Sequence, residues 1–129
     1  MNKIQKILKI LIVDDSPVAR KILKSCMPDD QEYEIHEAGD GAKGLEKFKE
    51  INPDITFMDL TMPVMDGMQA LESIKKINSN AIIIVCTADI QEKSISKVMI
   101  SGALSLIKKP PSKKSVQDAL VKAKEFLEI

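Results

Sequence analysis

The chain contains five short apolar runs, separated by longer segments in which apolar residues recur every three or four positions. The runs have the length of buried β-strands, and the spacing between them is typical of amphipathic helices. Strands that alternate with helices predict βαβ units, and therefore a doubly wound α/β fold: a five-stranded parallel sheet with helices on both faces. The predicted strands are Lys9–Val13, Tyr33–Glu37, Asp54–Met58, Ala81–Cys86 and Leu104–Ile107.

The composition of each run indicates its place in the sheet. The first, third and fourth runs are apolar almost throughout, which is typical of central strands that are buried on both faces. The second run, Tyr33–Glu37, alternates apolar and polar residues, so we expect it at an edge of the sheet.

Start signals and apolar stripes predict five helices. Ser16-Pro17 is typical of an N-cap followed by proline at the first helical position, and Asp89 with Glu92 resembles a capping box at the start of the fourth helix. The expected buried stripes are Val18, Ile22 and Cys26; Ala42, Leu45 and Phe48; Met68, Leu71 and Ile74; Ile95, Val98 and Met99; and Val116, Leu120, Ala123 and Leu127.

Length and composition favour one cytoplasmic domain over residues 1–129, with residues 1–8 as a short N-terminal extension. The 129 residues carry 19 basic and 19 acidic side chains, and this balance gives no general attraction to nucleic acid or anionic membranes. Aromatic residues make up 3% of the chain, which disfavours base-stacking surfaces. No apolar stretch approaches the length of a membrane span, and two cysteines do not form a disulfide framework.

Acidic residues directly follow two of the apolar runs, and a lysine follows a third. Asp14 and Asp15 come after the first run, Asp59 after the third and Lys109 after the fifth. The carboxyl ends of parallel strands meet at one edge, where open α/β sheets bind ligands, so we expect these side chains to converge. Neighbouring carboxylates repel each other unless a cation neutralises them, and Mg²⁺ favours such oxygen ligands. The pattern predicts a Mg²⁺ site; a simple helix-capping role for Asp14 or Asp15 is the alternative.

Asp59 is the candidate nucleophile of this edge, because a carboxylate can attack phosphorus and form an aspartyl-phosphate. Thr87 ends the fourth run and places a hydroxyl at the rim of the site. The ammonium group of Lys109 could hold a phosphoryl oxygen as a point charge. Strand alternation sends Lys108 to the opposite side of the chain.

Together these motifs resemble the receiver domain of two-component response regulators, of the single-domain, CheY-like type, over essentially the whole chain. The matching segments are Ile12–Ser16, Asp59–Pro63 with Asp66-Gly67, Thr87-Ala88, and Gly102-Ala103 leading to Lys109-Pro110. The resemblance implies a flavodoxin-like sheet with strand order 2-1-3-4-5 and a cis peptide bond between Lys109 and Pro110.

The resemblance also implies a role for each site residue. Asp59 would accept a phosphoryl group from a phosphohistidine of a sensor histidine kinase, in a Mg²⁺-dependent reaction. The hydroxyl of Thr87 and the ammonium of Lys109 would contact that group. The implied metal ligands are Asp14, Asp15, Asp59 and the backbone carbonyl of Thr61, with Asp14 acting mainly through a water. One departure is Leu106, which stands where the family often has a switching Tyr or Phe.

We therefore expect a monomeric signalling protein, and not an enzyme with a substrate of its own, although a receiver assists its own phosphorylation and autodephosphorylation. The signal would leave through a downstream protein, bound at the face formed by the fourth helix, fifth strand and fifth helix, and not through nucleic acid or membrane. A chemotaxis-type messenger and an intermediate carrier in a phosphorelay are both compatible with the sequence.

Two other classes fit less well. A Mg²⁺-dependent phosphohydrolase of the haloacid dehalogenase type needs a second acid two residues after its nucleophile, but Thr61 follows Asp59 and Ser16 follows Asp14 at that spacing. A flavin- or nucleotide-binding module needs a glycine-rich loop after the first strand, and the sequence has none there.

Overall fold

A computed structural model describes residues 7–29, 32–60, 62, 64–88 and 91–127. Strands and helices alternate along these residues, as predicted. The elements are β1 (Leu8–Val13), α1 (Pro17–Ser25), β2 (Tyr33–Ala38), α2 (Gly41–Ile51), β3 (Ile55–Met58), α3 (Gly67–Ile77), β4 (Ile82–Thr87), α4 (Glu92–Ile100), β5 (Ser105–Lys108) and α5 (Lys113–Leu127). No helix in the described ranges is long and apolar enough to cross a membrane.

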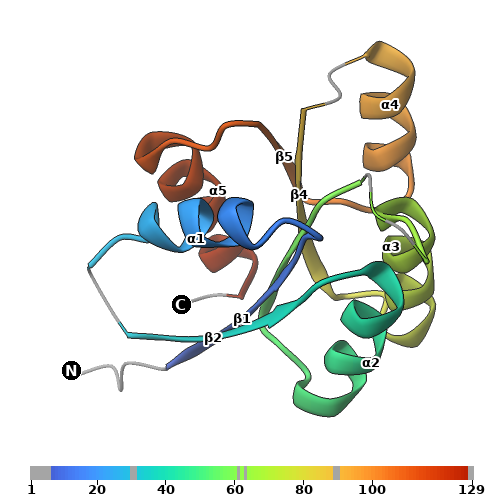
Figure 1. Cartoon of the computed structure of the whole chain (residues 1–129), viewed down its shortest axis with the longest axis horizontal. Helices are drawn as coiled ribbons and strands as arrows, with labels where there is room; N and C mark the ends of the chain where they lie inside the picture. Colours follow the sequence, from blue (N-terminus) through green and yellow to red (C-terminus); the bar gives the residue numbers. More distant parts are fainter. Residues whose placement is uncertain (1–6, 30–31, 61, 63, 89–90, 128–129) are drawn as a thin grey trace.

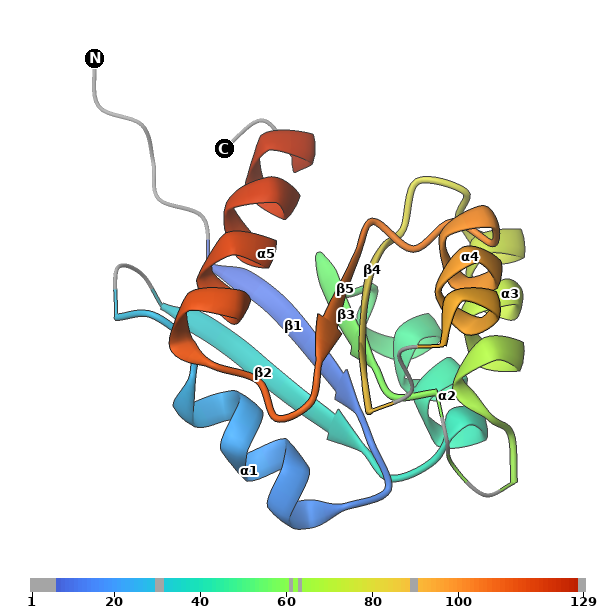
Figure 2. The same ribbon diagram turned by 90° about the horizontal axis from the view of Figure 1, so that it is seen from above.

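The five strands form one parallel sheet in the order β2-β1-β3-β4-β5, which confirms the predicted fold and places β2 at an edge. Figures 1 and 2 show helices on both sides of this sheet. Helices α1 and α5 cover one face, where Leu23 and Leu120 belong to one apolar cluster. Helices α2, α3 and α4 cover the other, where Phe48, Leu71 and Val98 belong to a second cluster.

Alternating side chains of the central strands supply both clusters. In β1, Ile10 and Ile12 point to the α1/α5 face, whereas Leu11 and Val13 point to the α2/α3/α4 face. All four side chains are at most 1% exposed, as expected for a strand buried on both faces. The two layers of core fix the strands firmly, and the polar residues that follow them are held at one edge of the sheet.

Helix α1 uses a different face from the one its sequence spacing predicted. Val18 and Ile22 are 66% and 41% exposed, so the predicted buried stripe was wrong for both and correct for Cys26. The helix instead packs through Leu23 and Cys26, which are 3% and 7% exposed. Four-residue spacing is compatible with two overlapping faces of a helix, and contact with the sheet selected the one through Leu23. The stripe predicted for α4 was likewise wrong for Met99, which is 41% exposed.

The start of α4 also differs from the prediction. The N-cap is Gln91, which makes no side-chain cap hydrogen bond, and Glu92 is the first helical residue. Glu92 therefore does not occupy the third helical position that the predicted capping box required. Asp89, the other member of that predicted box, lies outside the described residues.

Thr56 in β3 provides a test of the core. Its side chain is 1% exposed, and its hydroxyl has no hydrogen-bond partner within the described part of the chain. Burial of an unsatisfied polar group costs roughly 1–3 kcal/mol. We therefore expect Thr56→Val to raise the free energy of unfolding by about 1 kcal/mol, measured by urea denaturation. Thr56→Ala is the matched control, because it also removes a methyl group and leaves a cavity; a loss of stability in Thr56→Val would contradict the prediction.

Candidate functional site

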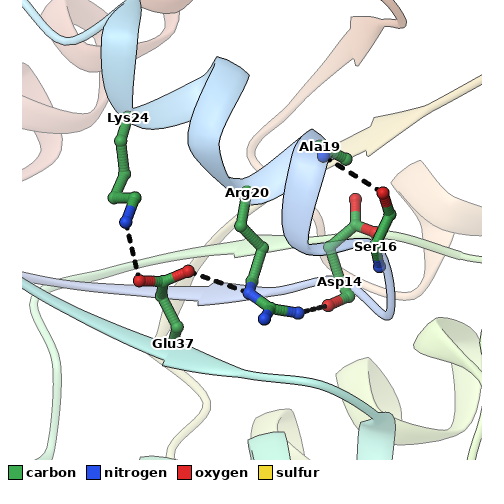
Figure 3. Close-up of polar contacts among 6 residues, drawn as sticks. All are labelled: Asp14, Ser16, Ala19, Arg20, Lys24 and Glu37. Atoms are coloured by element: carbon green, nitrogen blue, oxygen red, sulfur yellow. Dashed lines mark hydrogen bonds and ion pairs between the residues drawn. The ribbon is translucent and has the colours of Figure 1, made fainter.

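The turn after β1 holds Asp14 rigidly. The Asp14 N–H donates to the carbonyl of Ala38 at the end of β2, with an N–O distance of 3.1 Å. The Ser16 N–H donates to Asp14 Oδ1 at 2.9 Å, and the Ser16 hydroxyl caps α1 by accepting from the Ala19 N–H at 3.1 Å. Figure 3 shows Asp14 and Ser16 in this turn, with Ala19 above them on α1. The predicted N-cap is confirmed, and Asp14 is oriented by both its main chain and its side chain.

Asp59 follows β3 and lies beside this turn. Its N–H donates to the carbonyl of Val13 at 2.9 Å, which continues the sheet by one hydrogen bond beyond the strand. The side chain is buried, with the residue 6% exposed. The loop behind it is braced by Gly67 at the start of α3, whose N–H donates to the carbonyl of Leu60 at 2.9 Å. Strand pairing and the following helix thus fix the main chain of Asp59 from both sides.

Lys109 directly follows β5, at the opposite edge of the sheet from β2, and its side chain contacts both acids. Its Nζ lies 2.7 Å from Asp14 Oδ2 and 3.4 Å from Asp59 Oδ1. Its N–H donates to the carbonyl of Thr87 at 2.9 Å, and the peptide bond to Pro110 is cis, as the resemblance implied. Lys108 is exposed, so the structure brings Lys109, and not Lys108, to the acidic residues.

Burial and neighbouring charges shift the pKa values of Asp59 and Lys109. Burial, together with the nearby Asp14 charge, raises the pKa of the Asp59 carboxyl above its ordinary value, against the opposing effect of Lys109. Burial alone would lower the pKa of Lys109, but its hydrogen bond to Asp14 and the charge of Asp59 outweigh burial and raise it. The acids therefore repel each other, and one ammonium group offsets that repulsion only in part.

The acidic residues have the arrangement that a hard divalent cation requires. One carboxylate oxygen from each of Asp14, Asp15 and Asp59 lies within 4.8 Å of the others. Oxygen donors of this kind are the ones that Mg²⁺ favours, and a divalent cation would relieve the repulsion that raises the pKa of Asp59. The carbonyl of Thr61, the fourth predicted ligand, lies outside the described residues.

Thr87 and Leu106 lie on the two neighbouring strands β4 and β5. Thr87 ends β4 and is 1% exposed, so it is buried and does not lie at an open rim. Leu106 in β5 pairs with Val85 and packs against the apolar cluster on the α2/α3/α4 face. The role predicted for the Thr87 hydroxyl toward a phosphoryl group stays a prediction.

An apolar pocket of about 230 Å³ opens beside the three charged groups. Its walls include Ile22 of α1, Phe57 of β3, Cys86 of β4 and Pro111. Burial raises the pKa of the Cys86 thiol to about 11, so the thiol stays protonated at neutral pH and is a poor nucleophile. The other nucleophilic groups in the lining of this pocket are the carboxylates of Asp14 and Asp59.

The sequence reasoning missed two groups of residues near this site. Arg20 and Glu37 form an ion pair that reaches the main chain of Asp14. The available signal was their position: Arg20 lies in the second turn of the helix that follows Asp14-Asp15, and Glu37 ends the strand predicted beside the first one. Gly67 was noted only as part of the matching segment Asp66-Gly67, although a Cβ there would lie 1.8 Å from the carbonyl oxygen of Asp59.

The comparisons with known proteins agree with this geometry. The family model "Response regulator receiver domain" matches residues 10–121. The chemotaxis protein CheY of Thermotoga maritima is 42% identical over 115 residues, which cover 88% of this chain and 95% of that protein. CheY of Bacillus subtilis is 40% identical over 114 residues, with 88% and 95% covered.

Solved structures give the same result. CheY in the CheX-CheY-BeF3-Mg²⁺ complex from Borrelia burgdorferi superposes with a TM-score of 0.83 and 33% identity, covering 88% of this chain and 87% of that one. A CheY-like receiver domain protein from Methanospirillum hungatei superposes with a TM-score of 0.86 at 23% identity, covering 95% and 98%, and supports the fold. The chain belongs to the response regulator receiver family, and within it resembles CheY.

The raised pKa of Asp59 predicts a pH-dependent cost to stability. Because the folded state holds this proton more tightly than the unfolded state, the contribution of Asp59 to stability falls as pH rises from its ordinary pKa through its raised one. In metal-free buffer we expect Asp59→Asn to be more stable than wild type at pH 7, with the gain vanishing below the ordinary carboxyl pKa of about 3.9. Urea denaturation at several pH values measures this difference.

Asp118→Asn is the control for that series. Asp118 is 65% exposed and pairs only with Lys114, at 3.0 Å, among the described residues, so its substitution should change stability little at any pH. Lower stability of Asp59→Asn than of wild type at pH 7 would show that attraction to Lys109 outweighs burial and repulsion.

The contact between Gly67 and Asp59 predicts a steric effect. In Gly67→Ala the new Cβ would collide with main-chain atoms of Asp59 and Leu60, so the chain must shift. Overpacking of this kind costs roughly 1–3 kcal/mol of unfolding free energy, and the amide resonance of Asp59 should move. Gly39→Ala is the control, since its Cβ would come no closer than 3.9 Å to other atoms. Equal stability of the two variants would contradict the prediction.

Proposed function

We propose that this chain is a phosphoacceptor that signals through phosphorylation of Asp59. The observation that carries the proposal is the position of this buried carboxylate, 3.4 Å from the Lys109 ammonium and within a cluster of acids able to hold a divalent cation. The phosphodonor would be a phosphohistidine of a sensor kinase: a carboxylate oxygen of Asp59 bonds to phosphorus, the P–N bond breaks, and the imidazole leaves. Membership of the receiver family supports this reaction.

The chain's own residues would favour this transfer by position and charge. Bound Mg²⁺ would offset the negative charge of the phosphoryl oxygens, and its ligands would be Asp14, Asp15, Asp59 and the Thr61 carbonyl. Lys109 would exchange part of its contact with Asp14 for a phosphoryl oxygen, and Thr87 would donate its hydroxyl to another. Because phosphoryl transfer needs little covalent help from a protein, this preorganised charge supplies most of the catalysis.

For the output we propose a chemotaxis-type role, supported by identities of about 40% to CheY proteins across nearly their full lengths. The Borrelia burgdorferi relative forms a complex with CheX while carrying BeF3 and Mg²⁺. A downstream protein would bind this chain at the α4–β5–α5 face, where Met99 and Ile100 are 41% and 85% exposed. Lys108 lies exposed on the neighbouring strand and gives that face a positive charge.

Phosphorylation can be tested with a small phosphodonor. With Mg²⁺ and acetyl phosphate, wild type should gain one phosphoryl group in intact-protein mass spectra, and omission of Mg²⁺ should abolish the gain. Asp59→Asn should gain none, because an amide is a far weaker nucleophile than a carboxylate. Asp118→Asn, altered on the exposed surface of α5, should behave as wild type. Identical labelling of wild type and Asp59→Asn would overturn the proposed function.

A further inference from the structure

The carbonyl oxygen of Asp14 is bound by a side chain that the proposed reaction does not use. Arg20, from the second turn of α1, donates from Nη1 to this oxygen at 2.6 Å. The Arg20 side chain is 18% exposed, so the contact is largely shielded from water. Hydrogen bonds from a charged donor are about twice as strong as neutral ones. Figure 3 shows the guanidinium lying between Asp14 and Glu37.

Arg20 is itself held in place by the edge strand. Its Nε donates to Glu37 Oε1 at 2.8 Å, so one guanidinium group bridges β2 and the turn after β1. Lys24, one helical turn further along α1, donates to Glu37 Oε2 at 2.8 Å. Hydrogen bonds from Lys24 and Arg20 hold the pKa of Glu37 below its usual range, and the carboxylate therefore stays charged and braces Arg20 at neutral pH.

The hydrogen bond from Arg20 to the Asp14 carbonyl also affects Asp15, the next residue along the chain. The peptide unit between Asp14 and Asp15 is planar, so fixing the Asp14 carbonyl fixes the direction in which the chain enters Asp15. Asp15 is exposed, and its carboxylate has no hydrogen bond or ion pair to any described residue. Asp14, in contrast, is also held through its N–H and both side-chain oxygens. Asp15 is thus restrained through its main chain, by the orientation of this peptide on one side and by the hydrogen bonds of Ser16 on the other.

We propose that Arg20, braced by Glu37, is a positioning residue that orients the Asp14–Asp15 peptide and thereby holds the Asp15 carboxylate in the cation site. This inference rests on the proposed function, since it assumes that the acidic cluster binds Mg²⁺. Residues that orient metal ligands from outside the coordination sphere typically change metal affinity about 10–100-fold when they are replaced.

The charge of Arg20 and its positioning role predict opposite changes in Mg²⁺ affinity when Arg20 is replaced. A guanidinium near three carboxylates repels a divalent cation, so its removal should tighten Mg²⁺ binding if charge alone mattered. If Arg20 positions Asp15, its removal should instead weaken Mg²⁺ binding. The sign of the change in affinity therefore separates the two roles.

Arg20→Met and Lys24→Met form a matched pair for this test. Each removes one cation that pairs with Glu37 at 2.8 Å, but only Arg20 contacts the Asp14 carbonyl. We expect isothermal titration with Mg²⁺ to give a dissociation constant raised about 10-fold in Arg20→Met, and one unchanged or lowered in Lys24→Met. Arg20→Lys keeps the positive charge but loses the planar guanidinium whose separate N–H groups bind the Asp14 carbonyl and Glu37 at the same time. Its Mg²⁺ affinity should therefore resemble that of Arg20→Met. Unchanged or tighter binding by Arg20→Met overturns the proposal.

Two further measurements keep the result interpretable. Thermal unfolding in EDTA establishes that each variant is folded before titration. Amide hydrogen exchange of Ser16, whose N–H donates to Asp14 Oδ1, should be faster in Arg20→Met and unchanged in Lys24→Met, even without metal. If wild type fails to bind Mg²⁺, the proposed function fails, and exchange at Ser16 alone decides whether Arg20 holds the turn. If wild type binds and Arg20→Met binds equally well, only the inference about Arg20 fails.

Discussion

The bridge from Lys109 to two acids is the interaction on which the site depends. Asp14 and Asp59 are buried beside each other at the ends of adjacent central strands, where their charges repel and solvent offers little screening. Lys109 lies 2.7 Å from one and 3.4 Å from the other. This ammonium arrives from a residue 95 positions after Asp14, so the site is complete only when β5 has joined the sheet.

The first residues of α3 and α2 tie down the chain that follows Asp59. Gly67 of α3 donates to the Leu60 carbonyl, and Gly41 of α2 donates to the Met65 carbonyl at 3.0 Å. Between these anchors Val64 has a φ of 70°, in the left-handed region that costs an L-residue roughly 1–2 kcal/mol. Val64 keeps this conformation because Leu60 before it and Met65 after it are each tied to a helix, which is how strained residues persist near functional sites.

Sequence patterns predicted the sheet and its charged edge because both depend on short local signals. A run such as Ile10–Val13 can be buried in only a few ways, and the acids behind it emerge at one edge of a parallel sheet. The packing face of α1 depended on contact with the sheet, so the spacing of Val18 and Ile22 could not decide it. The hydrogen bonds of Arg20 to Glu37 and to the Asp14 carbonyl could not be predicted from the sequence either, because Glu37 lies opposite Arg20 only after β2 pairs with β1.

The position of Leu106 indicates how a signal can leave a site that lacks the usual aromatic residue. The Lys109 N–H donates to the Thr87 carbonyl, so a displacement of the Lys109 side chain would act on the ends of both β4 and β5. Leu106 lies three residues earlier on β5 and packs in the same apolar cluster as Val98 of α4. Under the proposed function, a phosphoryl group that draws Lys109 away from Asp14 would shift β5 against this cluster. Tightly packed cores transmit such shifts, and the exposed residues Met99 and Ile100 directly follow Val98 on α4.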